Sequence, residues 1–373
     1  MLRRRSITVR VTVLFAVFCM IAGMGFALRG TASAQQGNMH QIPVAGMGFG
    51  SALSPDGKTL AVFEISALHN DEVDPLVLPL RLVNLDTGAV TSLTGHTDYA
   101  SSAAWSGDGK LLVSYHSNGV IMVWDSASGK ELKRIRALPG RSAMALSADG
   151  KTLVTQAPGA VLGYMVWDLE SATITAILTP PYDTYKQISD MLQSGNIPDN
   201  ATTALALSPD GHTLAAATGF GNILLWDLAS GQMTPLVTST ATLPMLNIRA
   251  LAFSADGSTL TYVDTDAGVI HFLDMATGQD TNVIQAKTRA APAVTPDGHK
   301  VAWVDPDSKT IMLWDAAQPG SPQTVATIPD SAGMLQPIPY GALYFTPDAT
   351  RLVLSGFFAG DGNNNVWVID LAQ

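Results

Sequence analysis

The sequence predicts an all-β fold in which one four-stranded unit is repeated seven times. Composition is the first observation: of 373 residues, 47% are hydrophobic and 14% charged, which is enough apolar side chain for a large core. The 33 glycines and 21 prolines favour many short strands joined by turns over long helices. The second observation is a turn motif that recurs along the chain, as in repeat proteins.

The turn motif is a serine or threonine, a proline or small residue, an aspartate and, in every copy but the last, a glycine. An aspartate side chain folds onto the local backbone and a glycine accepts a positive φ, so each copy predicts a tight turn. The copies are Ser54–Gly57, Ser106–Gly109, Ser147–Gly150, Ser208–Gly211, Ser254–Gly257, Thr295–Gly298 and Thr346–Ala349.

Alternating apolar runs lie before and after each turn, as at 204–207 and 213–217, and predict an antiparallel hairpin of strands a and b. A third run, strand c, ends in aspartate, at Asp86, Asp274 and Asp370 in the three copies without a preceding tryptophan. A fourth run, strand d, completes the unit. The other four copies of strand c end in Trp124–Asp125, Trp167–Asp168, Trp226–Asp227 and Trp314–Asp315.

At these residues, and over residues 39–373, the sequence resembles the WD40-repeat family, with degenerate repeats; TolB-like and YVTN-type propeller repeats are near alternatives. The resemblance implies a seven-bladed β-propeller of four-stranded antiparallel blades. It also implies that His96, Ser114 and Trp124 share a hydrogen-bond network in the second blade, where Asn118 replaces the family's usual aspartate.

The two ends of the repeat region predict how the ring closes. The last unit stops after strand c, at 370–373, whereas an extra extended run at 39–45 precedes the first turn. Pairing that run with the last strand c would complete the seventh blade and remove two exposed strand edges. The WD40 family closes its ring in this way.

Residues 1–34 predict an export signal. Four arginines precede an apolar stretch at 11–28, and Ala32-x-Ala34 has the small-x-small pattern of a cleavage site. An uncleaved membrane anchor is the alternative, because the apolar stretch is close to the minimum length of a span. We therefore expect a secreted or extracytoplasmic protein with a single propeller domain at 35–373, touching a membrane only if the segment is uncleaved.

Several chemistries are disfavoured by the residues themselves. A net charge of −10 disfavours binding to nucleic acid, and one cysteine, Cys19, cannot build a cysteine zinc site. No catalytic or cofactor motif is found, so we expect a monomeric, non-enzymatic binding scaffold without cofactors. Asp361, Asn363 and Asn365 form a weak calcium candidate that lacks the later glutamate of a calcium loop.

The longest predicted connections all join strands b to c or d to a, on one face of the ring. They contain nine acidic residues and one lysine, Lys186, so we expect them to bind a basic or polar protein or peptide. A merely solvated acidic surface is the simpler alternative, and a secreted hydrolase or lyase with carboxylates in the central channel is the alternative function. The predicted contact residues are Asp71, Glu72, Asp74, Tyr182, Asp183, Tyr185 and Asp361.

Overall fold

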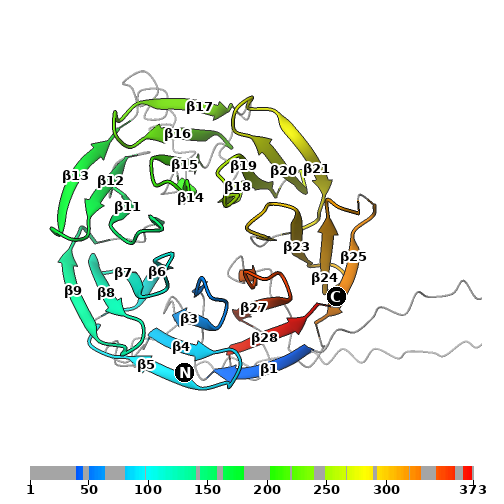
Figure 1. Ribbon diagram of the computed structural model, residues 1–373, viewed down its shortest axis with the longest axis horizontal. Coiled ribbons are helices and arrows are strands. Elements are labelled where there is room, and N and C mark those ends of the chain that lie inside the picture. The colour runs from blue at the N-terminus through cyan, green and yellow to red at the C-terminus, as the bar shows by residue number, and fades with distance from the viewer. Residues whose placement is uncertain are drawn as a thin grey trace, which may run out of the picture. The chain divides into compact units, whose positions relative to one another are not determined.

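The computed structural model is a closed ring of seven four-stranded antiparallel sheets, the blades, within the compact unit Ala34–Gln373 (Figure 1). The described residues contain no helix, and so none that could span a membrane. The structure describes residues 39–44, 50–63, 80–96, 98–139, 143–157, 163–179, 202–218, 221–238, 248–265, 267–288, 292–318, 320–328, 342–357 and 364–371.

The first four blades follow the chain, with strands a to d in sequence order from the centre outward. Their strands are β2 (Gly50–Leu53), β3 (Thr59–Phe63), β4 (Leu80–Asn84) and β5 (Val90–Leu93); β6 (Ala100–Trp105), β7 (Leu111–His116), β8 (Val120–Asp125) and β9 (Glu131–Arg136); β10 (Met144–Leu146), β11 (Thr152–Gln156), β12 (Tyr164–Asp168) and β13 (Thr173–Leu178); β14 (Thr202–Leu207), β15 (Thr213–Thr218), β16 (Ile223–Asp227) and β17 (Met233–Val237).

The last three blades continue the pattern, but the outer strand of the seventh comes from the other end of the repeat region. Their strands are β18 (Ile248–Phe253), β19 (Thr259–Asp264), β20 (Val269–Asp274) and β21 (Asp280–Gln285); β22 (Ala293–Val294), β23 (Lys300–Asp305), β24 (Thr310–Asp315) and β25 (Gln323–Thr327); β26 (Ala342–Phe345), β27 (Arg351–Phe357), β28 (Asn364–Asp370) and β1 (Met39–Val44).

The closure predicted from the sequence is present. Strand β1 pairs antiparallel with β28 along its whole length, from Met39 opposite Ile369 to Val44 opposite Asn364. Ile42 and Val44 of β1 are buried in the hydrophobic cluster that joins blade 7 to blade 1. The Arg351 guanidinium of blade 7 also donates to Asp86 of blade 1, with Nη1 and Oδ1 2.8 Å apart.

The core is distributed over the blade interfaces. Seven hydrophobic clusters can be distinguished, and each contains residues of two neighbouring blades. Alternate residues of strands b and c therefore face opposite neighbours, which explains why both sides of these central strands are apolar. A blade alone would expose both of its faces, so each depends on its neighbours for burial.

We predict that truncation in β1 destabilises the whole ring. Ile42 is 5% exposed, so Ile42→Ala should lower the free energy of unfolding by about 2–4 kcal/mol through loss of apolar contact and cavity formation. Gln41→Ala, at an exposed position of the same strand, should change it by less than about 0.5 kcal/mol. Urea unfolding measures both, and an Ile42→Ala midpoint equal to that of the parent would contradict the closure.

Candidate functional site

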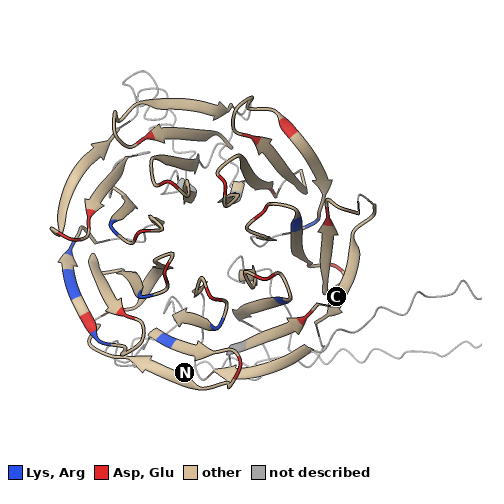
Figure 2. Ribbon diagram, viewed as in Figure 1, with Lys and Arg blue, Asp and Glu red and all other residues tan. Residues whose placement is uncertain are grey.

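The a–b turns lie around the centre of the ring on one face, which we call the turn face, and each carries an aspartate (Figure 2). In each turn the aspartate Oδ1 accepts the hydroxyl of the residue two before and the N–H of the residue two after, as Asp297 does from Thr295 and His299. In blade 5 the Ser254 hydroxyl and the N–H and hydroxyl of Ser258 lower the pKa of Asp256 to about 2. These carboxylates therefore stay ionised and serve the turns themselves.

The seventh turn places Ala349 where the others have glycine, with a φ of 53°. Neighbouring turns also contact one another: the Gly107 N–H donates to the Ala148 carbonyl at 2.7 Å, between blades 2 and 3. The turn face is therefore built from short, mutually bonded turns.

Blade 2 contains a continuous chain of side-chain hydrogen bonds. The Trp124 Nε1–H donates to the Ser114 Oγ at 2.9 Å, and the Ser114 hydroxyl lies 3.0 Å from the His116 Nε2. The His116 Nδ1 donates to the Asp98 carbonyl at 2.9 Å, which fixes Nε2 as the acceptor. The neutral imidazole is thus the form that fits the network.

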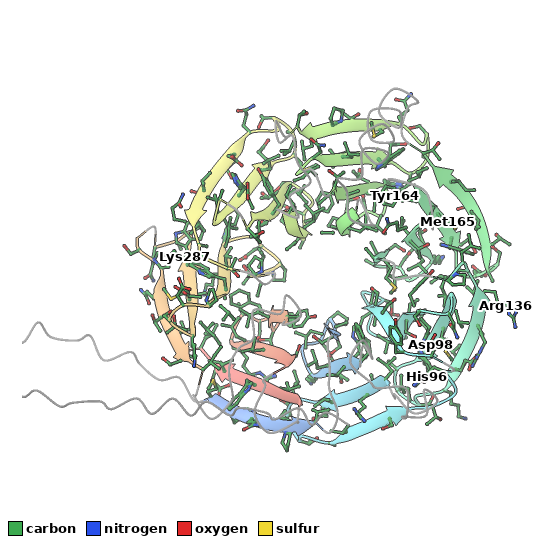
Figure 3. The ribbon with its side chains drawn as sticks, turned by 180° about the vertical axis from the view of Figure 1, so that it is seen from behind. His96, Asp98, Arg136, Tyr164, Met165 and Lys287 are labelled. Carbon is green, nitrogen blue, oxygen red and sulfur yellow. The ribbon has the colours of Figure 1, made fainter. Side chains whose placement is uncertain are left out.

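His96, which the resemblance places in this network, stacks on His116 with ring centroids 5.6 Å apart (Figure 3). It also meets the edge of Trp124 at 6.3 Å. The Asn118 Oδ1 accepts the N–H of Val120. His116 was not among the residues predicted from the sequence. It lies two residues after Ser114 on β7, so the two side chains project on the same side of the sheet.

The four tryptophans that directly precede a strand-c aspartate are all buried, from 0% exposed for Trp124 and Trp226 to 9% for Trp314. The Trp167 Nε1–H donates to the Thr155 Oγ1 at 3.0 Å, as Trp124 does to Ser114. The equivalent strand-b residue facing Trp226 is Ala216, and the Trp226 Nε1 is buried without a hydrogen-bond acceptor. In blades 2, 3 and 4, the indole is therefore hydrogen-bonded where strand b has a hydroxyl at this position and unsatisfied where it has alanine.

The aspartate that follows each tryptophan organises the c–d turn. Asp125, Asp168 and Asp227 each accept the hydroxyl and the N–H of the serine three residues later. Asp315 instead accepts the Ala317 N–H and lies 3.6 Å from the Lys300 ammonium.

In blade 1, strand c does not end at Asp86, as the comparison of the seven repeats predicted, but at Asn84. Asn84, not Asp86, is the residue opposite the first residue of strand b, and its Oδ1 accepts the N–H and hydroxyl of Thr87. Asn and Asp side chains both offer an acceptor oxygen to such a turn, so Asn84 can take the place of the aspartate. Strand c of blade 1 therefore ends two residues earlier than expected. Asp86 is thereby left to bind Arg351 across the closure.

Open hollows lie between blades in the described part of the structure, and we consider two of about 370 Å³ each. One opens on the turn face between blades 6 and 7, where Lys300, Asp315, Gln323 and Thr350 line it. The other lies between blades 5 and 6, where Gln285, Lys287, Trp303 and Asp305 line it. The Asp348 carboxylate in the first hollow, whose pKa is lowered to about 2 chiefly by hydrogen bonds from Thr346 and Thr350, is a weak general base. No three metal-ligating side chains gather among the described residues.

The predicted partner-binding residues lie outside the described residues: Asp71, Glu72, Asp74, Tyr182, Asp183, Tyr185 and Asp361. Of the calcium candidates, Asp361 and Asn363 lie outside them too, whereas Asn365 belongs to β28 and pairs with Pro43 and Gly356 in the sheet. What the structure does place is the set of strand ends that border these segments. Phe63, Leu80, Thr179, Thr202, Phe357 and Asn364 all lie on the face opposite the a–b turns, which we call the loop face.

We predict that the hydroxyl of strand b stabilises its blade by about 1 kcal/mol. Ala216→Ser should supply the missing acceptor to Trp226 and raise the free energy of unfolding, measured in urea, by that amount. Thr155→Val, which keeps the volume and removes the acceptor of Trp167, should lower the free energy of unfolding by about 1–3 kcal/mol. Equal midpoints for the parent and Thr155→Val would show that the bond contributes nothing.

We also predict a pH-dependent stability from blade 2. Burial lowers the pKa of His116 from 6.5 to about 4, so the unfolded chain binds a proton in this range and the folded one does not. The stabilisation is complete above pH 6.5 and decreases by about 3 kcal/mol as the pH falls to about 4. The slope of the unfolding free energy against pH reports how many more protons the unfolded chain binds than the folded one. In His116→Asn this difference should be smaller by about one proton over this window. An unchanged slope would contradict the assignment.

Comparison with known proteins agrees with this geometry. A family model described as WD domain, G-beta repeat, matches residues 88–125, the segment that contains Ser114 and Trp124. The small ribosomal subunit protein RACK1 of Brassica napus is 32% identical over 142 residues, 37% of this chain and 42% of the relative. An uncharacterized WD repeat-containing protein of Synechocystis is 32% identical over 152 residues, 40% of each chain. The matches span about two fifths of the length of these curated relatives.

Solved structures show the same fold over most of the chain. The β-propeller domain of Myceliophthora thermophila Cps50 (Swd1) matches with a TM-score of 0.64 at 16% identity, covering 88% of this chain and 98% of that one. A chain of the mitotic checkpoint complex matches with a TM-score of 0.64 at 16% identity, covering 95% and 100%. This chain is a seven-bladed, WD40-repeat-like β-propeller.

Proposed function

We propose that the protein is a non-enzymatic, extracytoplasmic scaffold that binds a partner protein or peptide on its loop face. A sequence relative is named as a small ribosomal subunit protein, and a chain with the same fold belongs to the mitotic checkpoint complex; both are parts of protein assemblies. The arginine-flanked apolar stretch in residues 1–34 supports export of the propeller.

The observation that carries the proposal is the difference between the two faces. On the turn face, the a–b aspartates accept hydrogen bonds from their own turns, and the turns are short and alike. The sequence segments that vary in length, 64–79, 180–201, 329–341 and 358–363, are all bordered by strand ends of the loop face. A partner that distinguishes this propeller from others has to recognise what differs between them.

Charge suggests the chemistry of the partner. The predicted connections of the loop face hold nine acidic residues against Lys186, in a chain whose net charge is −10. Such a surface attracts basic or polar partners and accelerates their association at low salt. The acidic residues are Glu64, Asp71, Glu72, Asp74, Asp183, Asp190, Asp199, Asp330 and Asp361.

The alternative is a secreted hydrolase or lyase with carboxylates in the central channel. The described strands a, which surround that channel, contain no aspartate or glutamate (Figure 1). Where a shift in carboxyl pKa is resolved among the described residues, it is downward, as for Asp108 and Asp348, each at about 2. A general acid needs the opposite shift, so these residues favour the scaffold.

The test begins with the mature protein as bait in the envelope or culture medium of its own source. The association rate of the captured protein should then fall as salt rises, because exposed charges are screened beyond about 8 Å at physiological ionic strength. Changing Asp71, Asp74 and Asp183 to Asn and Glu72 to Gln should slow association by about tenfold.

The matched control removes four charges from the turn face: Asp56, Asp210 and Asp297 to Asn, and Glu170 to Gln. This variant should associate at nearly the parent rate, after correction for any folded fraction lost with the turn hydrogen bonds. If the turn-face variant alone lost binding while still folded, the partner would dock on the turn face and the proposal would be wrong.

A further inference from the structure

The outermost strand of each blade has one edge without a partner strand, and most of these edges carry features that discourage pairing with another chain. Strand β9 is charged, β21 begins with Asp280, and β17 and β1 contain Pro235 and Pro43. Strands β5 and β25 are four and five residues long. Strand β13 has none of these features: its six residues, Thr-Ile-Thr-Ala-Ile-Leu, are uncharged, contain no proline and are mostly β-branched.

Two isoleucines make the edge of β13 apolar. Ile174 is 42% exposed and Ile177 is 61% exposed. Residues three apart in a regular strand point to opposite sides, but β13 has a bulge that leaves Thr175 without an opposite residue. Ile174 therefore lies opposite Trp167 and Ile177 opposite Met165; because Trp167 and Met165 are two residues apart, both isoleucines project on the same side of the sheet.

The neighbouring blade provides an internal comparison. Strand β9 has the same bulge, and Glu131 and Arg134 occupy the positions that correspond to Ile174 and Ile177. These two side chains form an ion pair at 2.7 Å, and Arg134 also donates to the Gly95 carbonyl. On the outer strand of blade 2, these two charged side chains are thus paired within the same chain. At the corresponding positions of blade 3, two apolar side chains are exposed instead.

The sequence of β13 is complementary to itself in antiparallel pairing. With the twofold axis between Thr175 and Ala176, Ile174 of one copy lies opposite Ile177 of the other, and the reverse pair completes a cluster of four isoleucines. The strand has no charge to repel an identical strand, although the whole chain carries a net charge of −10. Although both chains are acidic, no like charges lie directly opposite each other when two copies of β13 pair.

We propose that a second copy of this chain binds along β13, so that two blade-3 sheets join into one eight-stranded sheet across a twofold axis. The interface lies on the outer wall, so it leaves both loop faces accessible and is independent of the scaffold function proposed above. A single strand pair is smaller than the roughly 1,200 Å² of a stable interface, so the dimer is weak and depends on concentration. This proposal departs from the monomer expected from the sequence, and the concentration dependence of the association distinguishes the two.

Sedimentation velocity of the full chain over a range of micromolar concentrations tests the dimer. The parent should shift from monomer to dimer with rising concentration, and Ile177→Lys should weaken the association at least about tenfold by placing a charge in the isoleucine cluster. Val283→Lys is the matched control, because Val283 is a 51% exposed residue on the outer strand of blade 5. It should leave the association unchanged, and both variants should melt like the parent.

Disulfide trapping tests the register in a Cys19→Ser background. Opposite residues of an antiparallel pair lie within disulfide range, so Ile174→Cys with Ile177→Cys should give a covalent dimer on oxidation. Glu131→Cys with Arg134→Cys, at the corresponding positions of blade 2, should not. A parent that stays monomeric, a dimer that survives Ile177→Lys, or the absence of the β13 cross-link would each overturn the proposal.

Discussion

The pairing of β1 with β28 is the interaction on which the rest of the ring depends. Each blade buries its two faces against its two neighbours, so no blade has a complete core of its own. Without β1, blade 7 would end at an open edge and the cluster containing Ile42, Val44, Val83 and Val353 would lose part of its apolar surface. The Arg351–Asp86 ion pair adds a charged contact between the same two blades, and it exists because the strand-c turn of blade 1 uses Asn84 instead.

Within this ring the blades differ in how the buried indole of strand c is hydrogen-bonded. The difference depends on whether strand b offers one hydroxyl oxygen. Blade 2 links Trp124, Ser114 and His116 in one chain of hydrogen bonds, blade 3 keeps only the Trp167–Thr155 bond, and blade 4 leaves the Trp226 indole unsatisfied. A blade with a satisfied buried network is held in one arrangement, whereas one with an orphan donor pays the cost of desolvation. Local stability should therefore vary from blade to blade although the backbone repeats closely.

Much of the fold could be predicted because the same short turn and strand pattern recurs in every unit of the sequence. The Asp-Gly turns fixed the number of units, and the missing last strand pointed to the closure by residues 39–45. The register of blade 1 could not be predicted, because Asn84 and Asp86 are both plausible turn acceptors in a sequence. The role of His116 and the bulge at Thr175 depend on which atoms the folded strands bring together. The predicted contact residues of the loop face remain predictions, since they lie outside the described residues.

Hydrogen exchange of the β1 amides tests the central claim most directly. If β1 closes the ring, the amides of β1 that face β28 are protected to the same free energy as those of β27 and β28, because all three strands belong to one cooperative sheet. Exchange of these β1 amides at the rate of a frayed terminus, with β27 and β28 still fully protected, would show that the ring does not depend on this pairing.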